Sequence, residues 1–424
     1  MKEKLAPGAP AVDESIPLSV PHIAGNEWKY VKECLDTNWV SSVGSFVDRF
    51  EAAMAEYVGT KHAVATINGT AALHTALMAV GVEPDQEVLV STLTFVAPVN
   101  AIRYLGAWPV FMDSDPMYWQ MDPEKVETFL KKECRWQNGS LVNMTSGRRV
   151  VAILPVHILG YPCDMTPIME LAKNYGLTVV EDATESLGAS YEGRMVGRLG
   201  DIACFSFNGN KIITTGGGGM IVTDNQEWAE RARYLSTQAK DDPVEYIHNE
   251  IGYNYRLTNI QAAMGVAQLE QLPEFISKKR AIAGTYLETF QEWEEITLVP
   301  TRPNTEPVHW LYTILLSRNT TVDQRKALVS DLNRNGIGAR PLWHPIHGLP
   351  PYANCQAYSI EHADQLHARG VSLPSSVGLT DGDQERTVAA VKAAVGKLAS
   401  GSLASGSLAS GSLASKKGDT INAG

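Results

Sequence analysis

The chain has 424 residues, of which 44% are hydrophobic and 20% charged, and its formal net charge is -11. This length allows two domains, or one large domain with a smaller one attached, and the composition is typical of a globular protein. The acidic balance disfavours a nucleic-acid partner, because proteins that bind nucleic acids usually carry a basic surface. The five cysteines include no Cys-x-x-Cys pair, which argues against a disulfide framework or a zinc ribbon.

The sequence pattern contains no signal for a membrane. No apolar run is long enough to cross a bilayer, and the polar first residues do not resemble a signal peptide. Together with the unpaired cysteines, these observations predict a cytoplasmic protein that binds neither membranes nor nucleic acids.

The two ends of the chain differ in composition from the rest. Residues 1–15 predict a flexible lead, and the repeat LASGS opens a low-complexity tail at residues 398–424. Small polar repeats bury too little apolar surface to offset the entropy of ordering, so this tail is expected to be disordered. Between the ends we expect a large domain over residues 16–274 and a smaller α+β domain over residues 275–397.

Apolar runs alternate with helical patterns along the predicted large domain. The expected strands are 63–67, 87–91, 108–113, 150–157, 177–183, 202–207 and 220–224, and the expected helices are 69–80, 95–105, 167–176 and 258–272. Strands that are apolar throughout and separated by helices predict an α/β fold with a mostly parallel sheet covered on both faces. Ligands of such sheets bind beyond the carboxyl ends of the strands. Polar candidates at these ends are Thr70, Asp113, His157, Asp182 and Ser206.

The densest chemical signal is SFNGNKIITTGGGG, in which Lys211 lies between an apolar strand and four consecutive glycines. Glycine permits close backbone approach. A lysine amine removed from water becomes a nucleophile, because burial lowers its pKa, and it can then form a Schiff base with an aldehyde cofactor. The alternative is a surface lysine in a glycine-rich turn.

Two further segments supply anchors for such a cofactor. VVEDATES ends a strand on Asp182, and a pyridoxal-phosphate (PLP) ring needs an anion beside its pyridine nitrogen. The alternative for Asp182 is a helix cap. INGTAAL places Gly69, Thr70 and Ala71 at the start of a helix, where free N–H groups suit a phosphate. A plain capped helix is the alternative there, and the combination of the three segments favours PLP.

With these segments, the chain resembles the DegT/DnrJ/StrS family of sugar aminotransferases, which share the aspartate-aminotransferase architecture, PLP fold type I. The resemblance runs from about Ile16 to Leu398. It rests on IPLSVPHIAGNEW, SSVGSFVDRFEAAMAEYVG, NGTAALHTAL, TFVAPVNAI, EDATESLGA, the lysine segment, GYNYRLTNIQAA and RPLWHPIH. The segment FNGNKIITTGGGGMI is similar to the corresponding segment of enzymes that aminate UDP-linked 4-keto-6-deoxy-N-acetylhexosamines. These enzymes belong to legionaminic acid and bacillosamine pathways.

The resemblance implies a role for each matching residue. Lys211 would bind the aldehyde of PLP and later move a proton, and Asp182 would pair with the pyridine nitrogen. Gly69, Thr70 and Ala71 would hold the phosphate.

Three other positions match the family pattern around the same cofactor. Ser206 would join the phosphate contacts, and Phe95 would stack on the ring, with core packing as its alternative. Asn254 would reach the phosphate of a neighbouring subunit, which implies a homodimer with shared active sites.

Substrate contacts are less sharply defined. Arg256 is a candidate for an anionic substrate group, and His309, Tyr312 and His344 are candidates for a sugar pocket supplied by the small domain. His344 and His347 have no carboxylate or cysteine partner nearby in the sequence, so no metal site is predicted.

One position departs from the family pattern. Many members carry Gln or His where this chain has Glu185, near the phenolic oxygen of the cofactor. A carboxylate beside a phenolate is repulsive, so Glu185 has either a raised pKa or an orientation toward the substrate amine.

The predicted reaction transfers an amino group from L-glutamate to the C4 keto group of a nucleotide-linked 4-keto-6-deoxy sugar, ping-pong through pyridoxamine phosphate, for surface polysaccharide. The expected substrate is of the UDP-N-acetylhexosamine type, with a GDP-linked sugar of the perosamine type as the alternative. A sugar dehydratase of the family would carry histidine in place of Lys211, and a non-catalytic regulator would have a damaged cofactor site. A nicotinamide oxidoreductase would carry a G-x-G-x-x-G fingerprint, which the sequence lacks.

Overall fold

A computed structural model describes residues 15–242 and 244–403. The predicted flexible lead lies outside the described residues except for Ser15, and so does the predicted tail from residue 404 onward. The last helix continues to Ala399, two residues into the range predicted as a tail. No helix in the described ranges is long and apolar enough to cross a membrane.

An eight-stranded sheet forms the centre of the structure, in the order β1-β11-β10-β7-β6-β2-β3-β16. Its strands are β1 (His62–Thr66), β2 (Glu87–Ser91), β3 (Trp108–Met112), β6 (Val150–Leu154), β7 (Thr178–Asp182), β10 (Ile202–Ser206), β11 (Gly219–Thr223) and β16 (Gln356–Tyr358). Neighbouring strands are parallel except for β11, which runs antiparallel to both β1 and β10. The predicted mostly parallel sheet is confirmed, and every strand predicted for it is present.

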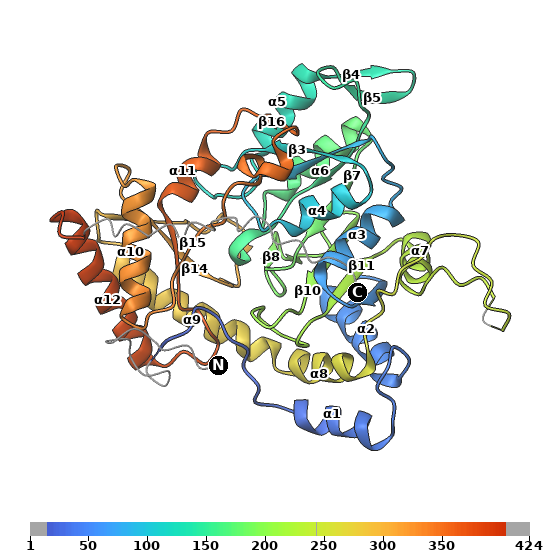
Figure 1. Cartoon of the computed structure of the whole chain (residues 1–424), viewed down its shortest axis with the longest axis horizontal. Helices are drawn as coiled ribbons and strands as arrows, with labels where there is room; N and C mark the ends of the chain where they lie inside the picture. The colour runs from blue at the N-terminus through green and yellow to red at the C-terminus, as the bar shows by residue number, and fades with distance from the viewer. Residues whose placement is uncertain (1–14, 243, 404–424) are drawn as a thin grey trace, which may run out of the picture.

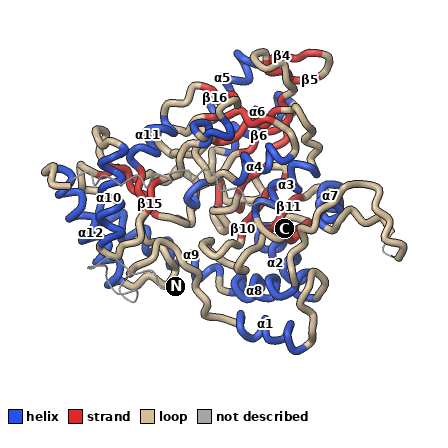
Figure 2. The backbone as a smooth tube through the Cα atoms, in the orientation of Figure 1, coloured by secondary structure: helices blue, strands red, loops and turns tan. Residues whose placement is uncertain are grey.

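Helices cover both faces of this sheet (Figure 1; Figure 2). One face packs against α3 (Gly69–Ala79), α4 (Ala97–Tyr104) and α7 (Gln226–Ser236), and the other against α2 (Ser45–Val58), α5 (Pro123–Glu133), α6 (Met165–Tyr175) and α8 (Asn259–Glu270). Alternate residues of β10 divide between the two cores, with Phe205 on the α2 side and Cys204 on the α3 side. This alternation follows from the two-residue period of a strand and explains why the strand is apolar throughout.

A second, antiparallel sheet lies in the C-terminal part of the chain. Its strands are β12 (Ile296–Leu298), β14 (Tyr312–Leu316), β17 (Gly370–Leu373) and β15 (Arg340–Pro341). The helices α9 (Leu272–Phe290), α10 (Val322–Arg334) and α12 (Asp381–Ala399) build a separate core with it. In Figure 1, α10 and α12 stand on the side of this sheet that is remote from the large sheet.

The two predicted domains share elements in the structure. The boundary expected at residue 275 falls inside the first turn of α9, which follows α8 with only Gln271 between them. β16 comes from the range 275–397 and yet pairs with β3 at the edge of the large sheet. The C-terminal range therefore contributes to both sheets.

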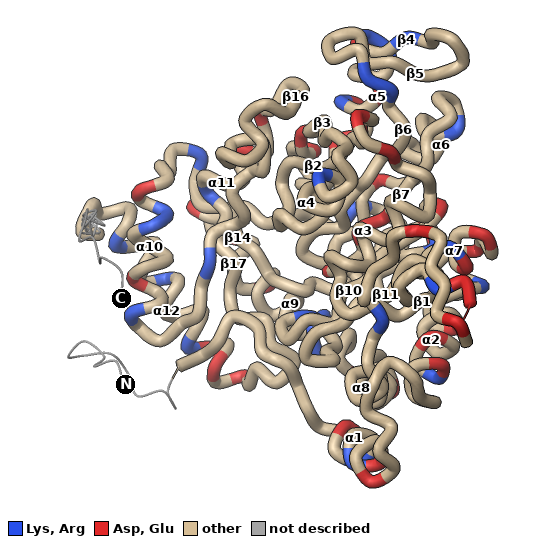
Figure 3. The backbone as a smooth tube through the Cα atoms, turned by 45° about the vertical axis from the view of Figure 1, so that its right-hand side comes forward, with Lys and Arg blue, Asp and Glu red and all other residues tan. Residues whose placement is uncertain are grey.

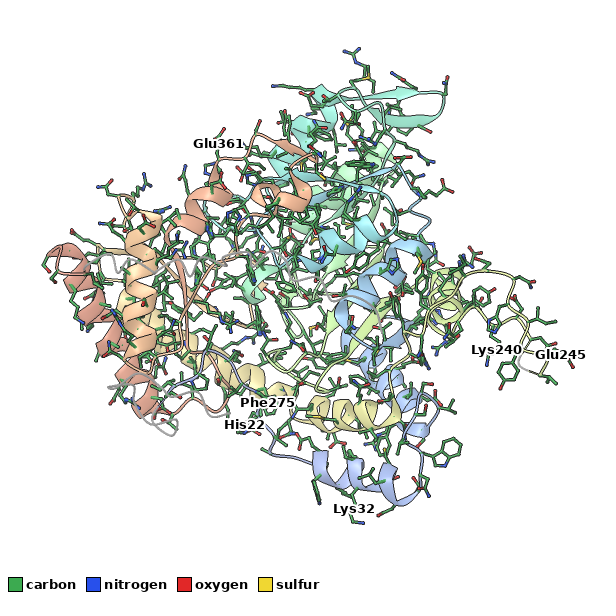
Figure 4. All side chains as sticks on the ribbon, in the orientation of Figure 1. His22, Lys32, Lys240, Glu245, Phe275 and Glu361 are labelled. Carbon is green, nitrogen blue, oxygen red and sulfur yellow. The ribbon has the colours of Figure 1, made fainter. Side chains whose placement is uncertain are left out.

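Smaller elements lie around the two sheets. They are α1 (Glu27–Asp36), α11 (His362–Arg369), the hairpin β4 (Cys134–Gln137) and β5 (Ser140–Asn143), the short strands β8 (Ser190–Tyr191), β9 (Arg194–Met195) and β13 (Thr305–Glu306), and the 3-10 turns Ile158–Gly160, Ile346–Gly348 and Pro350–Tyr352. The loop that follows α7 projects from the body and carries Lys240 and Glu245, both labelled in Figure 4. Figure 3 shows acidic residues gathered around α7 and α2.

Two of the polar residues at strand ends have structural partners. The carboxylate of Asp113 is fully buried and accepts hydrogen bonds from the backbone N–H groups of Glu361, His362 and Ala363, at 2.8, 3.0 and 2.9 Å. His157 accepts the N–H of Cys163 on Nδ1 and directs Nε2 at Glu181, 3.0 Å away. Asp113 therefore caps α11.

We predict that Asp113→Ala lowers the free energy of unfolding by about 2 kcal/mol or more, because three N–H groups at the start of α11 lose their buried acceptor. Urea unfolding followed by circular dichroism measures the change. Asp323→Ala at the exposed first turn of α10 is the matched control, with an expected change below about 0.5 kcal/mol. Equal stability of both variants would contradict the capping role.

Candidate active site

A cavity of about 560 Å³ lies at the carboxyl edge of the large sheet and reaches the small sheet. Residues that follow β1, β7 and β10 line it on one side, and residues of β15 and β17 line it on the other. The predicted cofactor residues that the structure brings together here are Gly69, Thr70, Phe95, Asp182, Glu185, Ser206 and Lys211. They come from four regions of the sequence and meet because parallel strands place their carboxyl ends at one edge.

Lys211 lies in the turn between β10 and β11. Its N–H donates to the carbonyl of Asn208, 3.0 Å away, and its side chain is mostly buried. Nζ of Lys211 is 3.6 Å from Oε1 of Glu185 and 4.1 Å from the ring centroid of Trp310. The lysine is thus an enclosed amine facing a carboxylate, and the alternative of a surface lysine is wrong.

The backbone beside Lys211 is held from two directions. The carbonyl of Asn210 accepts hydrogen bonds from Nε1 of Trp310, at 2.7 Å, and from Oγ of Ser19, at 3.0 Å. Trp310 is itself fixed, because its carbonyl accepts from the buried Nζ of Lys279, at 2.6 Å. The position of the amine therefore depends on segments from both sheets and from the N-terminal part of the described chain.

Two carboxylates face this amine from the end of β7 and the loop beyond it. Burial raises the pKa of Asp182, which the N–H of Thr184 and the charge of Lys211 partly offset. Burial also raises the pKa of Glu185, to about 7, against the opposing effects of Lys211 and of the Leu159 N–H. A buried carboxylate without a full counter-charge is suited to pair with a cationic ring nitrogen or an ammonium group.

The opposite end of the cavity is built around the first turn of α3. A Cβ atom on Gly69 would lie 2.8 Å from Cβ of Ser206, so only glycine permits this close approach between α3 and β10. Asn68 caps the helix by accepting the N–H of Ala71 on Oδ1, at 2.8 Å. The N–H of Ala71 therefore donates to the helix cap, and Ala71 does not line the cavity. Gly69, Thr70 and Ser206 do line it.

The N-terminal segment forms one wall of the cavity. Pro17, Leu18 and Ser19 line it. Ile16 exchanges hydrogen bonds with Gly336 and Gly338 beside β15, both at 2.7 Å, and the carbonyl of Leu18 accepts from Ser375 N, at 2.8 Å. This segment ties the small sheet to the lysine turn.

Four predicted substrate contacts do not line the cavity of this chain. His309 is largely buried and hydrogen-bonds to the hydroxyl of Tyr161, at 2.9 Å, and burial lowers its pKa to about 4. Tyr312 packs in the core of the small sheet. His344 directs Nδ1 at the carbonyl of Pro345, and NH1 of Arg256 is 2.6 Å from Glu51. None of the four lines the cavity of this chain, so their roles as substrate contacts stay predictions.

Sequence reasoning missed three cavity residues of the small sheet and its surroundings. Trp310 and Trp343 line the cavity with parallel rings whose centroids are 6.3 Å apart, and Arg340 adds an exposed guanidinium. A signal was available for Arg340 and Trp343, which lie in the segment RPLWHPIH that had drawn attention to its histidines, whereas Trp310 lies outside that segment. Phe95 does line the cavity and is 57% exposed, which excludes core packing.

Asn254 and the histidine pair lie elsewhere. Asn254 forms an isolated bridge with Thr237 and is not among the residues that line this cavity. His347 contacts Thr92 through Nδ1, at 2.8 Å. Within residues 15–242 and 244–403, no group of three or more His, Cys, Asp or Glu side chains is arranged to hold a metal ion.

Residues 21–392 match the sequence model of the DegT/DnrJ/EryC1/StrS aminotransferase family. The chain belongs to this family. It is 42% identical over 382 residues to the GDP-perosamine synthase of Caulobacter vibrioides, covering 89% of this chain and 97% of that protein. The GDP-perosamine synthase of Escherichia coli O157:H7 is 41% identical over 367 residues, covering 86% of this chain and 94% of that protein.

Solved structures agree with this assignment. PseC of Helicobacter pylori, an aminotransferase involved in the biosynthesis of pseudoaminic acid, covers 91% of this chain with a TM-score of 0.82 and 25% identity, and this chain covers 100% of PseC. The protein is a PLP-dependent sugar aminotransferase, and the predicted fold type I is confirmed. The two relatives at 42% and 41% identity are named for a GDP-linked sugar, which favours the predicted alternative over the UDP-linked substrate.

We predict that Gly69→Ala weakens PLP binding by about tenfold or more, because its methyl group would collide with Ser206 at the phosphate end of the cavity. Titration of the apoprotein with PLP, followed by absorbance, measures the affinity. Gly284→Ala on α9, where an added Cβ meets nothing within 4 Å, is the control and is expected to keep the affinity. An unchanged affinity in Gly69→Ala would remove this residue from the phosphate site.

The raised pKa of Glu185 predicts a pH-dependent stability difference. A carboxyl whose folded pKa is about 7 and whose unfolded pKa is near 4.5 binds more protons in the folded state at pH values between the two. The free energy of unfolding of the wild type therefore falls as pH rises through that window. Apoprotein with Glu185→Gln should therefore gain stability relative to the wild type, by about 2–3 kcal/mol between pH 4.5 and 7. Urea unfolding at several pH values tests this, and parallel curves would contradict it.

Proposed function

We propose that the protein transfers an amino group from L-glutamate to the C4 keto group of a GDP-linked 4-keto-6-deoxy sugar, for surface polysaccharide. The carrying observation is the enclosed Lys211 amine, 3.6 Å from Glu185 in the same cavity as Asp182 and the Gly69 turn. The GDP-linked substrate is supported by two relatives named GDP-perosamine synthase. The similarity to this chain covers 97% and 94% of their lengths. The identity of the nucleotide in this proposal rests on these relatives.

The donor groups of the cavity fit PLP. Asp182 would pair with the pyridine nitrogen, because a cationic N–H supplies the opposite charge that this buried carboxylate needs. Gly69, Thr70 and Ser206 would hold the phosphate at the start of α3, where the helix dipole favours an anion. When bound, PLP would supply an electron sink for the carbanion of the substrate.

Lys211 carries the proton transfers in this proposal. Its Nζ would accept the proton from the α-carbon of glutamate and later deliver one to C4 of the sugar, as a positioned general base and acid. Trp310, Trp343 and the N-terminal segment at Leu18 enclose the amine and limit the access of water. Arg340 is the exposed cation of the cavity lining and would attract anionic groups of the two substrates.

A second subunit completes the proposed active site. Asn254 bridges Thr237 and does not line the cavity of its own chain. Its match to a family position that reaches the neighbouring phosphate supports a homodimer with shared active sites. Phe95, open to the cavity, would stack on the cofactor ring.

We predict that Lys211→Ala abolishes turnover, because the cavity then lacks its amine. The wild-type protein should be yellow with PLP and lose this colour on addition of L-glutamate, and borohydride should fix the cofactor to Lys211 alone. Absorbance and peptide mass spectrometry measure both. Lys278→Ala, exposed on α9, is the matched control and should behave as the wild type. A borohydride adduct at another residue would refute the proposed site.

For the substrate, we predict a kcat/KM at least about tenfold higher with a GDP-linked 4-keto-6-deoxy sugar than with the UDP-linked N-acetyl counterpart, with L-glutamate as donor. Product formation is measured by mass spectrometry of the aminated sugar nucleotide. Preference for the UDP-linked sugar would overturn the assignment of the nucleotide and leave the aminotransferase chemistry intact.

A further inference from the structure

Glu185 is held in a fixed orientation by the turn that follows β6. Its Oε2 accepts the backbone N–H of Leu159, at 2.7 Å, and this leaves Oε1 facing Nζ of Lys211, at 3.6 Å. The side chain is 4% exposed, so bulk water has little access to either oxygen. The carboxyl group thus has one oxygen committed to the backbone and the other to the amine.

The turn that holds Glu185 is unusual in its backbone. Leu159 has a φ of 60° and Gly160 a φ of 90°, a region that costs a residue with a side chain about 1 kcal/mol or more. The carbonyl of Gly160 accepts the N–H of Val308, at 3.0 Å, and a Cβ on Gly160 would lie 2.6 Å from Trp310 N. The turn therefore joins Glu185 to the segment that carries Trp310 over Lys211.

The charges around Glu185 leave Lys211 as its partner. The ionisable groups that act on it are Lys211 and Asp182. Asp182 directs Oδ1 at the N–H of Thr184, at 3.1 Å, and within the described residues the ion pair of Lys211 is the one with Glu185.

We propose that Glu185 is the proton-exchange partner of Lys211, a residue that acts through the lysine and does not itself touch the substrate. In this step the N–H bond of the Lys211 ammonium breaks and an O–H bond forms on Oε1, which leaves a neutral amine and a neutral acid. The reverse transfer restores the ion pair, so atoms and charge balance without another reactant. The inference deepens the proposed function and depends on it.

The chemistry of the residue supports this role. A carboxyl whose pKa burial raises to about 7 exchanges protons near neutral pH, whereas an amide at this position cannot accept one. A neutral amide at this position could also orient a bound group through hydrogen bonds, so orientation alone does not require a carboxylate. The exchange keeps the proton inside the enclosed cavity while the amine acts on the substrate.

The first test uses apoprotein and needs no turnover. Trace acetic anhydride labels free amines, and mass spectrometry gives the labelling of Lys211 as a function of pH. Because the neutral amide of Glu185→Gln offers no charge to the ammonium 3.6 Å away in the wild type, this variant should shift the Lys211 labelling curve to lower pH by about one unit, a tenfold change in reactivity at fixed pH. Lys278 in the same samples is the internal reference, and coincident Lys211 curves would overturn the proposal.

The second test follows the loss of cofactor colour after addition of L-glutamate, by stopped flow across pH 5.5–9. The rate of the wild type should change with pH around pH 7, because Glu185 titrates there. Glu185→Gln should lose this dependence and react at least about tenfold more slowly than the wild type. Glu306→Gln, at an exposed carboxylate, should leave the profile unchanged. A Glu185→Gln profile that keeps the change of rate near pH 7 overturns the proposal.

Two further outcomes are separable. If Glu185→Gln does not fold, Glu185→Asp replaces it in both tests. Its shorter carboxyl group should keep the change of rate near pH 7 and shift the pH at which Lys211 is labelled. An unchanged labelling curve of Lys211 would overturn the inference. If borohydride finds no adduct at Lys211 in the wild type, the proposed function itself fails. If the wild type transaminates and Glu185→Gln matches it at every pH, only the role of Glu185 fails.

Discussion

The parallel direction of β1, β6, β7 and β10 is the constraint on which the active site depends. Each of these strands delivers its next residues to the same edge of the large sheet, so Gly69, Glu185 and Lys211 meet although more than a hundred residues separate the first from the second. The antiparallel β11 has a separate consequence. It lets the chain return beside β10 through the loop of residues 207–218, which presents Lys211 at that edge without a crossover helix.

Burial then gives these side chains their chemistry. Burial raises the pKa of both Asp182 and Glu185, because few solvent dipoles stabilise the charge of an enclosed carboxylate. The enclosure comes from both sheets, with Trp310 at the start of the small sheet and Leu18 in the N-terminal segment. The electrostatics of the site are therefore a property of the whole architecture and of no single motif.

Most of the large sheet, and several residues that line the cavity, could be predicted from the sequence because those signals are local. Lys211, Asp182 and Gly69 each sit at the junction of an apolar strand with a turn or helix, a pattern visible within about ten residues. β16 escaped prediction because three residues become a strand only by pairing with β3, far away in the chain.

The positions of the predicted substrate contacts could not be read from the sequence for a related reason. The direction of the His309 and Tyr312 side chains depends on the register of the small sheet and on the positive φ of His309, which periodicity does not encode. Trp310, between Lys279 and the lysine turn, could be recognised only once these three segments lay together.

The segment from Ile16 to Ser19, which lines the cavity and bonds to the small-sheet region, has a practical consequence for work with this protein. The region that matches the family begins at residue 21, and a recombinant fragment trimmed to that boundary would lack a wall of its own catalytic chamber. It would also lose the Ser19 hydroxyl that holds the carbonyl next to Lys211. Fusion partners belong upstream of Ile16. A comparison of homologues over the matching region alone omits the part of the pocket formed by Pro17, Leu18 and Ser19.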